Sequence, residues 1–304
     1  MPSRLHQTFA YVVPRVRRAR ELVDEPTERA RVLAWHKTLD RRLPIRAVPR
    51  FERRFAVVTE ELTGPRGAFS SYVLTPRHRE PTRTLLYVHG GGFMAPIDAF
   101  HVRYATRLAT ALDARVVLPD YPLAPEHTWR DSFEALTALA ARWSDQPGGA
   151  VLAGDSAGGG YALALALALR DRGGPRPTHL LLHSPWVDLT MGAPGTVERD
   201  AVDPWLFIGK ATAYAAWWAG SPDHLARPEV SPGLGDLAGL PPALMTYGTR
   251  DLLAPGCEQL VRRAGEAGWD LNAVVEPDVL HVFALMPALV EARRAFRTTV
   301  GFLS

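Results

Sequence analysis

The stretch AVLAGDSAGGGYALALALALR, residues 150–170, decides the fold. It begins with a short apolar run, passes through a glycine-rich turn, and ends in a run of alternating leucine and alanine. Strict alternation over residues 161–170 is the period of a strand. We nevertheless predict a helix there, because Ala and Leu are strong helix formers and β-branched residues are absent. A helix that is apolar almost all round must be buried.

Similar apolar runs recur along the chain. Short apolar strands that are separated by helices and lack alternation are typical of a mostly parallel sheet buried on both faces, in one α/β domain. Helices are expected over 99–112 and about 130–143, and over 3–40 as one or two amphipathic helices broken near Pro14 and Pro26. Strands are expected at 55–62, 71–75, 84–88, 114–118, 150–153, 179–183, 243–247 and 272–275.

Composition excludes several classes of protein. The chain has 304 residues, of which 47% are hydrophobic, so it can bury a large core. No apolar run approaches the ~20 residues of a membrane-spanning helix, and the first 30 residues contain no apolar signal-peptide region. Cys257 is the only cysteine, which excludes an internal disulfide and fits a reducing compartment. We therefore expect a cytoplasmic protein without a membrane span.

Positive charge is concentrated in the N-terminal segment. A nucleic-acid surface is one interpretation of such clusters. Acidic residues interrupt them, however, and this favours a solvated helical face with pairs of opposite charge, so we expect no nucleic-acid partner. The arginines are Arg15, Arg17, Arg18, Arg20, Arg41, Arg42, Arg53 and Arg54, and the acids are Glu21, Asp24, Glu25, Glu28 and Asp40.

The turn within the opening stretch carries the first candidate for catalysis. Residues 154–158 read Gly-Asp-Ser-Ala-Gly, a G-x-S-x-G pattern between a predicted strand and a predicted helix. A serine on such a sharp turn has its Oγ exposed above the sheet, and glycines on either side of it avoid backbone clashes. Ser156 is therefore a candidate nucleophile. The alternative is a glycine-rich helix start in which Ser156 only caps the helix.

A serine nucleophile needs a base and an orienting carboxylate. In hydrolases with this turn, the order along the chain is serine, acid, histidine. His281 follows the last predicted strand and is the candidate base, whereas His179 and His183 fall in a strand and His224 in a polar loop. Asp251 follows the strand at 243–247, at the carboxyl end where sites of open α/β sheets gather. We favour it over its rival, Asp278.

The sequence HGGGF at residues 89–93 follows another predicted strand. Serine attack on an ester creates an oxyanion, which backbone N–H groups stabilise. Glycines let the backbone come close to a substrate, so we expect the N–H groups of Gly91 and Gly92 to bind the oxyanion together with that of Ala157. His89 is expected to hold the loop. A phosphate-binding loop is the rival, but no G-x-x-x-x-G-K-[ST] pattern is present.

Three motifs together resemble the hormone-sensitive-lipase family of α/β-hydrolases, in its bacterial esterase branch. They are HGGGF at 89–93, YPLAPE at 121–126 and GDSAGG at 154–159, and the resemblance covers roughly residues 55–304. It implies an eight-stranded α/β-hydrolase sheet, a Ser156-Asp251-His281 triad and an oxyanion hole at Gly91, Gly92 and Ala157. It also implies that Glu126 and Asp155 support the site through hydrogen bonds.

The chain departs from the family pattern at three positions. Leu252 follows Asp251 where the family often has proline. Pro122 stands where an arginine is common, and Val282 stands where glycine is frequent. Each residue type of the triad is nevertheless present.

The resemblance further implies a helical cap on the catalytic domain. The cap would comprise residues 1–54 and an insertion at about 187–228, with residues 55–304 forming the catalytic domain. Large apolar residues in or near these segments are expected either to line the substrate pocket or to pack the cap onto the body. They are Phe93, Trp205, Leu206, Phe207, Tyr214, Trp217 and Trp218.

These features predict a serine carboxylesterase for short- to medium-chain esters, with a small-molecule substrate and no metal or organic cofactor. The same groups could hydrolyse a lactone or an amide, or transfer an acyl group to another acceptor. A receptor without catalysis is a further alternative, as in the plant gibberellin receptors that resemble this family. Those lack the catalytic histidine, whereas His281 is present here. A homodimer through the last strand or helix is compatible with the family.

Overall fold

The structure is a computed structural model that describes residues 2–16 and 21–304. Arg17, Arg18 and Arg20, three of the clustered arginines, therefore lie outside the described residues. No helix in the described ranges has the length and apolar character that crossing a membrane requires.

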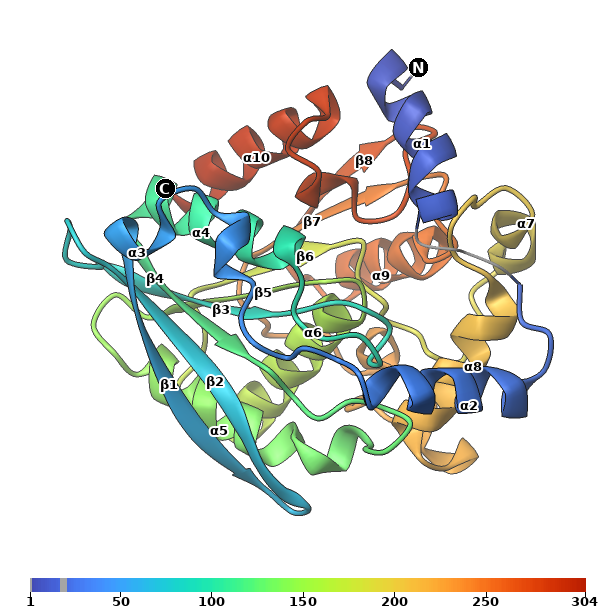
Figure 1. Cartoon of the computed structure of the whole chain (residues 1–304), viewed down its shortest axis with the longest axis horizontal. Coiled ribbons are helices and arrows are strands. Elements are labelled where there is room, and N and C mark those ends of the chain that lie inside the picture. Colours follow the sequence, from blue (N-terminus) through green and yellow to red (C-terminus); the bar gives the residue numbers. More distant parts are fainter. Residues whose placement is uncertain (1, 17–20) are drawn as a thin grey trace.

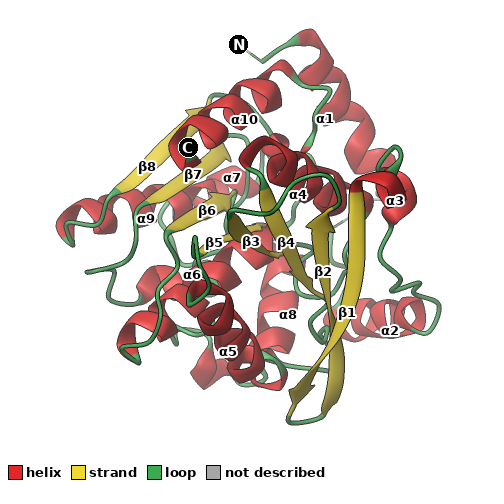
Figure 2. Cartoon of the chain, turned by 90° about the vertical axis from the view of Figure 1, so that its left-hand side faces the viewer, coloured by secondary structure: helices red, strands yellow, loops and turns green. Residues whose placement is uncertain are grey.

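The centre of the molecule is one sheet, and the described residues contribute eight strands to it in the order β1-β2-β4-β3-β5-β6-β7-β8 (Figures 1 and 2). Strand β2 is antiparallel to both of its neighbours, and every other pair is parallel. The predicted mostly parallel sheet is thus confirmed. The strands are β1 (Phe55–Gly64), β2 (Gly67–Pro76), β3 (Arg83–Val88), β4 (Ala114–Pro119), β5 (Ala150–Asp155), β6 (His179–His183), β7 (Ala243–Gly248) and β8 (Leu271–Glu276).

Helices cover both faces of the sheet. Helices α4 and α10 lie on one face, and α5, α6 and α9 lie on the other (Figures 1 and 2). The helices are α1 (Arg4–Val16), α2 (Glu25–His36), α3 (Phe51–Arg54), α4 (Ala99–Leu112), α5 (Phe133–Ser144), α6 (Ser156–Asp171), α7 (Thr196–Asp200), α8 (Ile208–Ala219), α9 (Ala254–Glu266) and α10 (Val290–Leu303). Single 3₁₀ turns are η1 (Ile45–Ala47), η2 (Trp129–Asp131), η3 (Pro222–His224), η4 (Pro232–Leu234) and η5 (Phe283–Leu285).

The run of alternating Ala and Leu is helical, as predicted. It forms most of α6, in which nearly every residue is buried. Burial on all sides explains the composition: α6 packs against the sheet and also against α5, so no side of it is left for polar residues. Its first turn follows β5 directly and places Ser156 at the carboxyl end of the sheet.

Two boundaries differ from the prediction. Strand β2 begins at Gly67, four residues before the predicted start at 71, because it pairs with β1 up to the turn, where Gly64 lies opposite Gly67. Pro14 does not break the first helix; it lies in the last turn of α1. Pro26 instead starts α2, in whose first turn its missing N–H costs no hydrogen bond.

The first 54 residues contact three different parts of the molecule. In α1, the ring Nε2 of His6 accepts a hydrogen bond from the N–H of Leu280, at 3.0 Å. Helix α2 contacts α8, where Tyr214 Oη donates to Glu28 and Trp217 Nε1 donates to Glu25. The segment from η1 to α3 joins the apolar core on the α4 face. The N-terminal segment is thus tied to residues far away in the sequence, among them Leu280, which directly precedes His281.

Candidate active site

Three of the predicted residues meet at the carboxyl end of the sheet. Ser156 begins α6, Asp251 follows β7, and His281 follows β8. The Oγ of Ser156 lies 2.9 Å from Nε2 of His281, and Nδ1 of His281 lies 2.8 Å from Oδ2 of Asp251. Because Nδ1–H donates to the carboxylate, Nε2 is left to accept the serine proton. All three side chains are buried.

The turn at Ser156 is held in a strained conformation. Its φ is +51°, in the left-handed region that non-glycine residues rarely adopt. A Cβ on Gly154 would lie 2.3 Å from the carbonyl oxygen of Gly158, and one on Gly158 would lie 2.2 Å from that of Val88. Neither position therefore accepts a side chain without moving the backbone. This is the physical reason for glycines on both sides of the serine.

The HGGGF loop presents N–H groups beside this serine turn. Gly91 and Gly92 have φ values of +105° and +61°, which glycine adopts without steric cost. Among the described residues, no hydrogen-bond acceptor is found for the N–H of either glycine. Ala157 lies in the first turn of α6, where N–H groups have no partner within the helix. These are the donors that an oxyanion would require.

Asp155 fixes the loop to the serine turn. Its Oδ1 accepts from the N–H of Gly90 at 3.1 Å and from the hydroxyl of Tyr87 at 2.7 Å. Burial alone would raise the pKa of Asp155, but the charge and hydrogen bond of His101 and the hydroxyl of Tyr87 outweigh it and lower that pKa. The carboxylate is therefore ionised and holds the loop through its backbone.

His89 also holds the HGGGF loop in place. Its Nδ1 lies 2.8 Å from the carbonyl oxygen of Gly90, and its ring stacks on Tyr121 at 4.3 Å between centroids. The hydroxyl of Tyr121 donates to the carbonyl oxygen of His89. Burial and the nearby charge of His101 lower the pKa of His89 to about 3, so the ring is neutral. It lies away from the acceptor position that His281 occupies beside Ser156.

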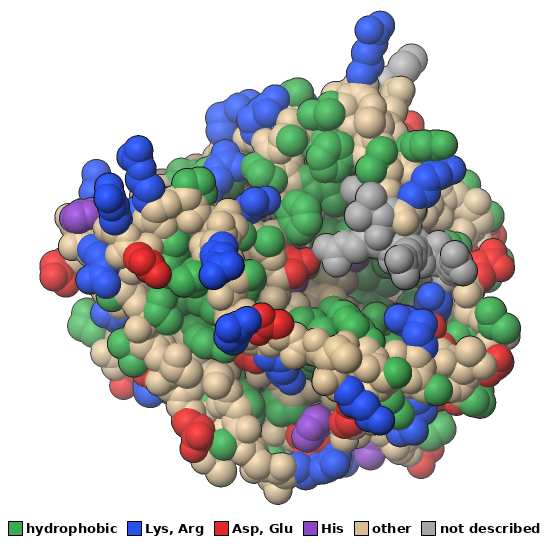
Figure 3. All heavy atoms as spheres, in the orientation of Figure 1, with side chains coloured by type: hydrophobic (Ala, Val, Ile, Leu, Met, Phe, Trp, Pro, Cys, Tyr) green, Lys and Arg blue, Asp and Glu red, His purple; other side chains and the backbone are tan. Residues whose placement is uncertain are grey.

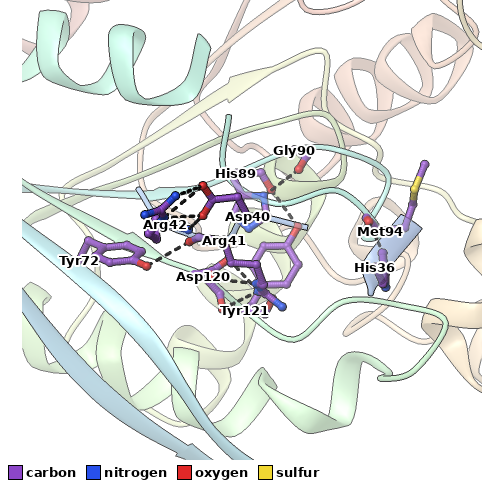
Figure 4. A network of polar contacts seen from close by, with 10 residues as sticks. All are labelled: His36, Asp40, Arg41, Arg42, Tyr72, His89, Gly90, Met94, Asp120 and Tyr121. Atoms are coloured by element: carbon purple, nitrogen blue, oxygen red, sulfur yellow. Dashed lines mark hydrogen bonds and ion pairs between the residues drawn. The ribbon is translucent and has the colours of Figure 1, made fainter. Parts of the chain in front are cut away.

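Glu126 is linked to the backbone just after the HGGGF loop indirectly, through His36. Its Oε2 lies 2.8 Å from Nδ1 of His36. The Nε2 of His36 lies 2.8 Å from the carbonyl oxygen of Met94 (Figure 4). Nearby, Arg41 binds Asp120 through two hydrogen bonds and also donates to the carbonyl oxygen of Tyr121. An arginine thus reaches the stretch that contains Pro122, although it comes from the N-terminal segment.

Asp203 is a site residue that the sequence did not predict. Its Oδ2 accepts from the N–H of Leu252 at 2.7 Å, and its Oδ1 accepts from Trp205 at 2.8 Å and Leu206 at 3.1 Å. Burial, and next the charge of Asp251, raise the pKa of Asp203 to about 6. No motif marks this residue, because it lies in an irregular segment between α7 and α8.

The charge of His281 depends on these carboxylates. Burial lowers the pKa of His281, but the charge and hydrogen bond of Asp251, followed by the charges of Asp203 and Asp155, outweigh that effect. The net pKa is raised above its usual value. The ring of Trp205 stands edge-on to His281, with 5.8 Å between centroids, and helps to close the imidazole off from solvent.

The rival residues lie elsewhere. Asp278 is exposed, and its N–H donates to Thr249 rather than approaching His281. His183 is buried between Thr246 and Tyr104, at 2.7 Å from each hydroxyl. His224 lies in η3, where Nδ1 is 3.0 Å from the carbonyl oxygen of Ala219.

The predicted pocket residues fall into two groups. Phe93 and Trp218 are almost fully buried and stack on each other at 4.4 Å, so they form the packing between the loop and α8. Trp217 is also buried, and its indole N–H is bound by α2. Trp205 and Phe207 are half-buried and belong to the irregular segment before α8. Figure 3 shows the surface hollowed on the side of α2 and α8.

Comparison with known proteins agrees with this geometry. A model of the alpha/beta hydrolase fold matches residues 85–285. The chain belongs to this family. An acetyl-hydrolase from Streptomyces hygroscopicus is 34% identical over 229 residues, which cover 74% of this chain and 76% of that protein. An esterase from Acinetobacter venetianus is 31% identical over 226 residues, covering 73% and 74%.

Comparison with solved structures indicates which group of α/β-hydrolases this chain resembles. The crystal structure of an esterase from the bacterial hormone-sensitive lipase family superposes with a TM-score of 0.79 and 27% identity. The superposition covers 100% of this chain and 98% of that one. The predicted resemblance to the hormone-sensitive-lipase family is therefore confirmed.

Proposed function

We propose that the chain hydrolyses carboxylic esters of short to medium acyl chain length through an acyl-enzyme formed on Ser156. Membership of the family, with relatives that are an acetyl-hydrolase and an esterase, makes it a carboxylic ester hydrolase. The continuous hydrogen-bond chain from Ser156 through His281 to Asp251 carries the finer proposal.

In the first half of the reaction, Ser156 Oγ attacks the ester carbonyl carbon while His281 Nε2 takes the hydroxyl proton. Asp251 keeps the ring oriented and stabilises the imidazolium that forms. The tetrahedral intermediate collapses when the C–O bond to the alcohol breaks, and His281 gives its proton to the departing alkoxide. The products are a free alcohol and a serine ester of the acid.

In the second half, water takes the place of the alcohol. His281, neutral again, accepts a proton from the water as its oxygen attacks the acyl carbon. Collapse of this second intermediate breaks the bond to Ser156 Oγ, which recovers the proton from His281. The acid product leaves and gives its proton to the solvent, so it is released as the carboxylate. The protein's groups end in their starting protonation states, so the cycle needs no metal or cofactor.

Both intermediates carry an oxyanion. In our proposal, the N–H groups of Gly91, Gly92 and Ala157 bind it, and each donor of this kind contributes about 10²–10³-fold in rate. Support for this assignment is that these N–H groups lack acceptors while the loop is fixed by Asp155 and His89. Donors fixed in advance need no reorganisation as charge develops.

We further propose that residues 1–54 and about 187–228 form a cap that limits the acyl chain. Two aromatic rings from the second segment support this. Trp205 stands beside His281, and the ring of Tyr214 lies 3.3 Å from where a Cβ on Gly92 would be. Aromatic walls this close to the proposed oxyanion site leave room for short chains and restrict long ones.

The proposal is tested with p-nitrophenyl esters from acetate to palmitate. We expect kcat/KM to peak at short to medium chains and Ser156→Ala to reduce kcat by roughly 10⁵-fold or more, with an unchanged circular dichroism spectrum. Asp278→Asn is the control for Asp251→Asn, because only Asp251 contacts His281. Substantial turnover by the Ser156→Ala variant would refute the acyl-enzyme mechanism.

A further inference from the structure

A second pocket lies on the face of the sheet that α4 and α10 cover. Its volume is about 430 Å³, within the range of ligand-binding pockets. Its floor is apolar and consists of buried side chains from α4, η5, α10 and the residue that follows η1. They include Val48, Tyr104, Ala284, Leu285 and Phe296.

The rim of this pocket is positively charged. It carries Arg54, Arg103 and Arg107. Arg54 donates to the hydroxyl of Thr110 and Arg103 donates to the carbonyl oxygen of Ala47, both of which are uncharged acceptors. The guanidinium of Arg107 lies 3.6 Å from the centre of the Phe296 ring. No carboxylate of the described residues forms an ion pair with any of the three, so their charges are uncompensated.

None of the residues that line the pocket is an Asp or Glu, although α3, which carries Arg54, also contains the exposed Glu52. Helix α4 contains three basic residues and no Asp or Glu. In α10, the carboxylate of Glu291 is taken up by Ser3 of α1. Burial is the largest effect on the pKa of Arg107 and lowers it; Tyr104 opposes this effect, and the charge of Arg293 adds to it. Figure 3 shows Lys and Arg side chains gathered on the part of the surface over α4 and α10.

A groove on the other side of the molecule provides the contrast. It is of similar size, about 470 Å³, and also carries three arginines. There, however, each arginine has an aspartate beside it, as Figure 4 shows for two of them. The pairs are Arg41 with Asp120, Arg42 with Asp40, and Arg66 with Asp131. Three arginines in a groove thus do not suffice to attract an anion; the absence of carboxylates distinguishes the α4–α10 pocket.

We propose that the α4–α10 pocket binds a free fatty carboxylate, with its hydrocarbon tail on the apolar floor and its carboxylate on the rim arginines. The apolar floor suits the hydrocarbon tail of a single-chain anion, and the cationic rim suits its carboxylate. An inorganic anion would leave the floor unused, and a neutral ester would leave the arginines without a charged partner. A cationic amphiphile would be repelled.

The pocket adjoins elements of the proposed active site. Ala284 and Leu285 belong to η5, which begins two residues after His281. The hydroxyl of Tyr104 lies 2.7 Å from Nε2 of His183, at the carboxyl end of β6. A carboxylate is also the product of ester hydrolysis, so this site would respond to accumulated product. Binding itself does not depend on the proposed roles of Ser156, His281 and Asp251.

Titration calorimetry with sodium decanoate, below the concentration at which it self-associates, tests the proposal on the full chain. We expect one saturable site whose dissociation constant rises about threefold to fivefold in Arg103→Gln and in Arg107→Gln. Ala111→Trp fills the pocket from an exposed helical position and should abolish binding. Arg42→Gln, in the compensated groove, is the matched control and should leave the dissociation constant unchanged.

Thermal unfolding supplies a second readout. Decanoate should raise the melting temperature of the wild type and of Arg42→Gln, but not that of Ala111→Trp. Three results would overturn the proposal. One is the absence of saturable binding to the wild type. Another is equal binding by Ala111→Trp, which would place decanoate elsewhere, for example near Ser156. The third is equally tight binding of decan-1-ol, which would deny the arginines a role.

Discussion

Asp203 and Asp251 accept hydrogen bonds from consecutive backbone N–H groups. Oδ2 of Asp203 lies 2.7 Å from the N–H nitrogen of Leu252, and Oδ1 of Asp251 lies 2.9 Å from that of Leu253. Two buried carboxylates are therefore held beside one turn. Burial and then the charge of Asp251 raise the pKa of Asp203 to about 6, so Asp203 loses its proton less readily than an exposed aspartate does. Above that pH, the negative charge of Asp203 adds to the effect of Asp251 on His281.

Removing the charge of Asp203 should shift the pH dependence of catalysis. His281 must be neutral to accept the serine proton, so activity rises as pH increases through the pKa of His281. The charge of Asp203 contributes to raising that pKa. In Asp203→Asn we therefore expect the acidic limb of the profile of kcat/KM against pH to move to lower pH, measured with a p-nitrophenyl ester of short chain.

The control for this prediction is Asp278→Asn. Asp278 is closer to His281 in sequence but exposed, so its charge is screened by solvent and the acidic limb should not move. An acidic limb that stays in place in Asp203→Asn, or moves to higher pH, would contradict the electrostatic role of Asp203. A general loss of activity at every pH would instead indicate displaced backbone at Leu252.

The sequence predicted those parts of the site that local patterns encode. Ser156 became a candidate because its turn needs glycines on both sides, and His281 because it follows a strand in the required order. The positions of Gly91 and Gly92 were marked by their lack of side chains. For the fold, short apolar runs sufficed, because the central strands β3 to β7 are buried on both faces of the sheet.

The parts that the sequence did not predict depend on tertiary contacts. Asp203 lies in an irregular segment, whereas His36 and His6 lie in the N-terminal helices; all three reach the site region through contacts with residues distant in the sequence. A single polar residue in such a position has no local feature that distinguishes it from a solvated one. The same holds for Arg41, which belongs to the arginine clusters that we interpreted as a solvated face but binds Asp120.

At position 282, glycine should make the protein more stable than alanine does, which is the reverse of the usual order. The φ of Val282 is +46°, which is strongly disfavoured for a β-branched residue, and its N–H is held by Ser184 Oγ at 3.1 Å. Ordinarily glycine is less stable than alanine by about 0.5–1 kcal/mol. Here, Val282→Gly relieves the strain whereas Val282→Ala retains it, so we expect the glycine variant to be more stable by about 1 kcal/mol.

Urea unfolding of the two variants measures this difference. Both lose the buried valine side chain, so that loss cancels in the comparison. Equal stability, or greater stability of Val282→Ala, would show that the left-handed backbone at this position carries no strain. If Val282→Gly is the more stable variant, backbone conformation, and not substrate contact, explains the glycine that the family often has at this position.

Gly158→Ala should separate the serine turn from β3. The added Cβ would lie 2.2 Å from the carbonyl oxygen of Val88 and 2.3 Å from that of His89, and both are backbone atoms that cannot move aside cheaply. The start of α6 must shift, and with it the N–H of Ala157. We expect kcat to fall by about 10²-fold or more, since a displacement of about 1 Å has this effect on catalysis.

Gly265→Ala is the matched control for this substitution. It also adds one methyl group to a helix, but no atom lies within 4 Å of the new Cβ. We expect it to leave kcat unchanged and to stabilise the protein by up to about 1 kcal/mol. If Gly158→Ala retained full activity, the close approach of α6 to β3 would not be needed to position Ala157.

His6 should couple the N-terminal helix to the catalytic loop. Its Nε2 accepts the N–H of Leu280, the residue before His281, and the ring is 1% exposed. In His6→Ala that buried N–H loses its partner, which costs about 1–3 kcal/mol of unfolding free energy. In His6→Gln the side-chain oxygen can reach the same N–H. We therefore expect Gln, but not Ala, to preserve stability and kcat near pH 7.5.

The pH dependence of this contact has a defined sign. Burial is the largest effect and lowers the pKa of His6 below its usual 6.5, because it disfavours the charged ring; the charge of Glu291 opposes this and that of Arg250 adds to it. The unfolded chain then binds more protons than the folded one, so this contribution to stability is complete above pH 6.5 and is lost as pH falls toward the folded pKa. Urea unfolding at pH 7.5 and pH 5 should show His6→Gln losing less stability than the wild type on acidification. If the two lose stability equally, the ring of His6 does not titrate against Leu280 and the N-terminal helix is coupled to the loop by packing alone.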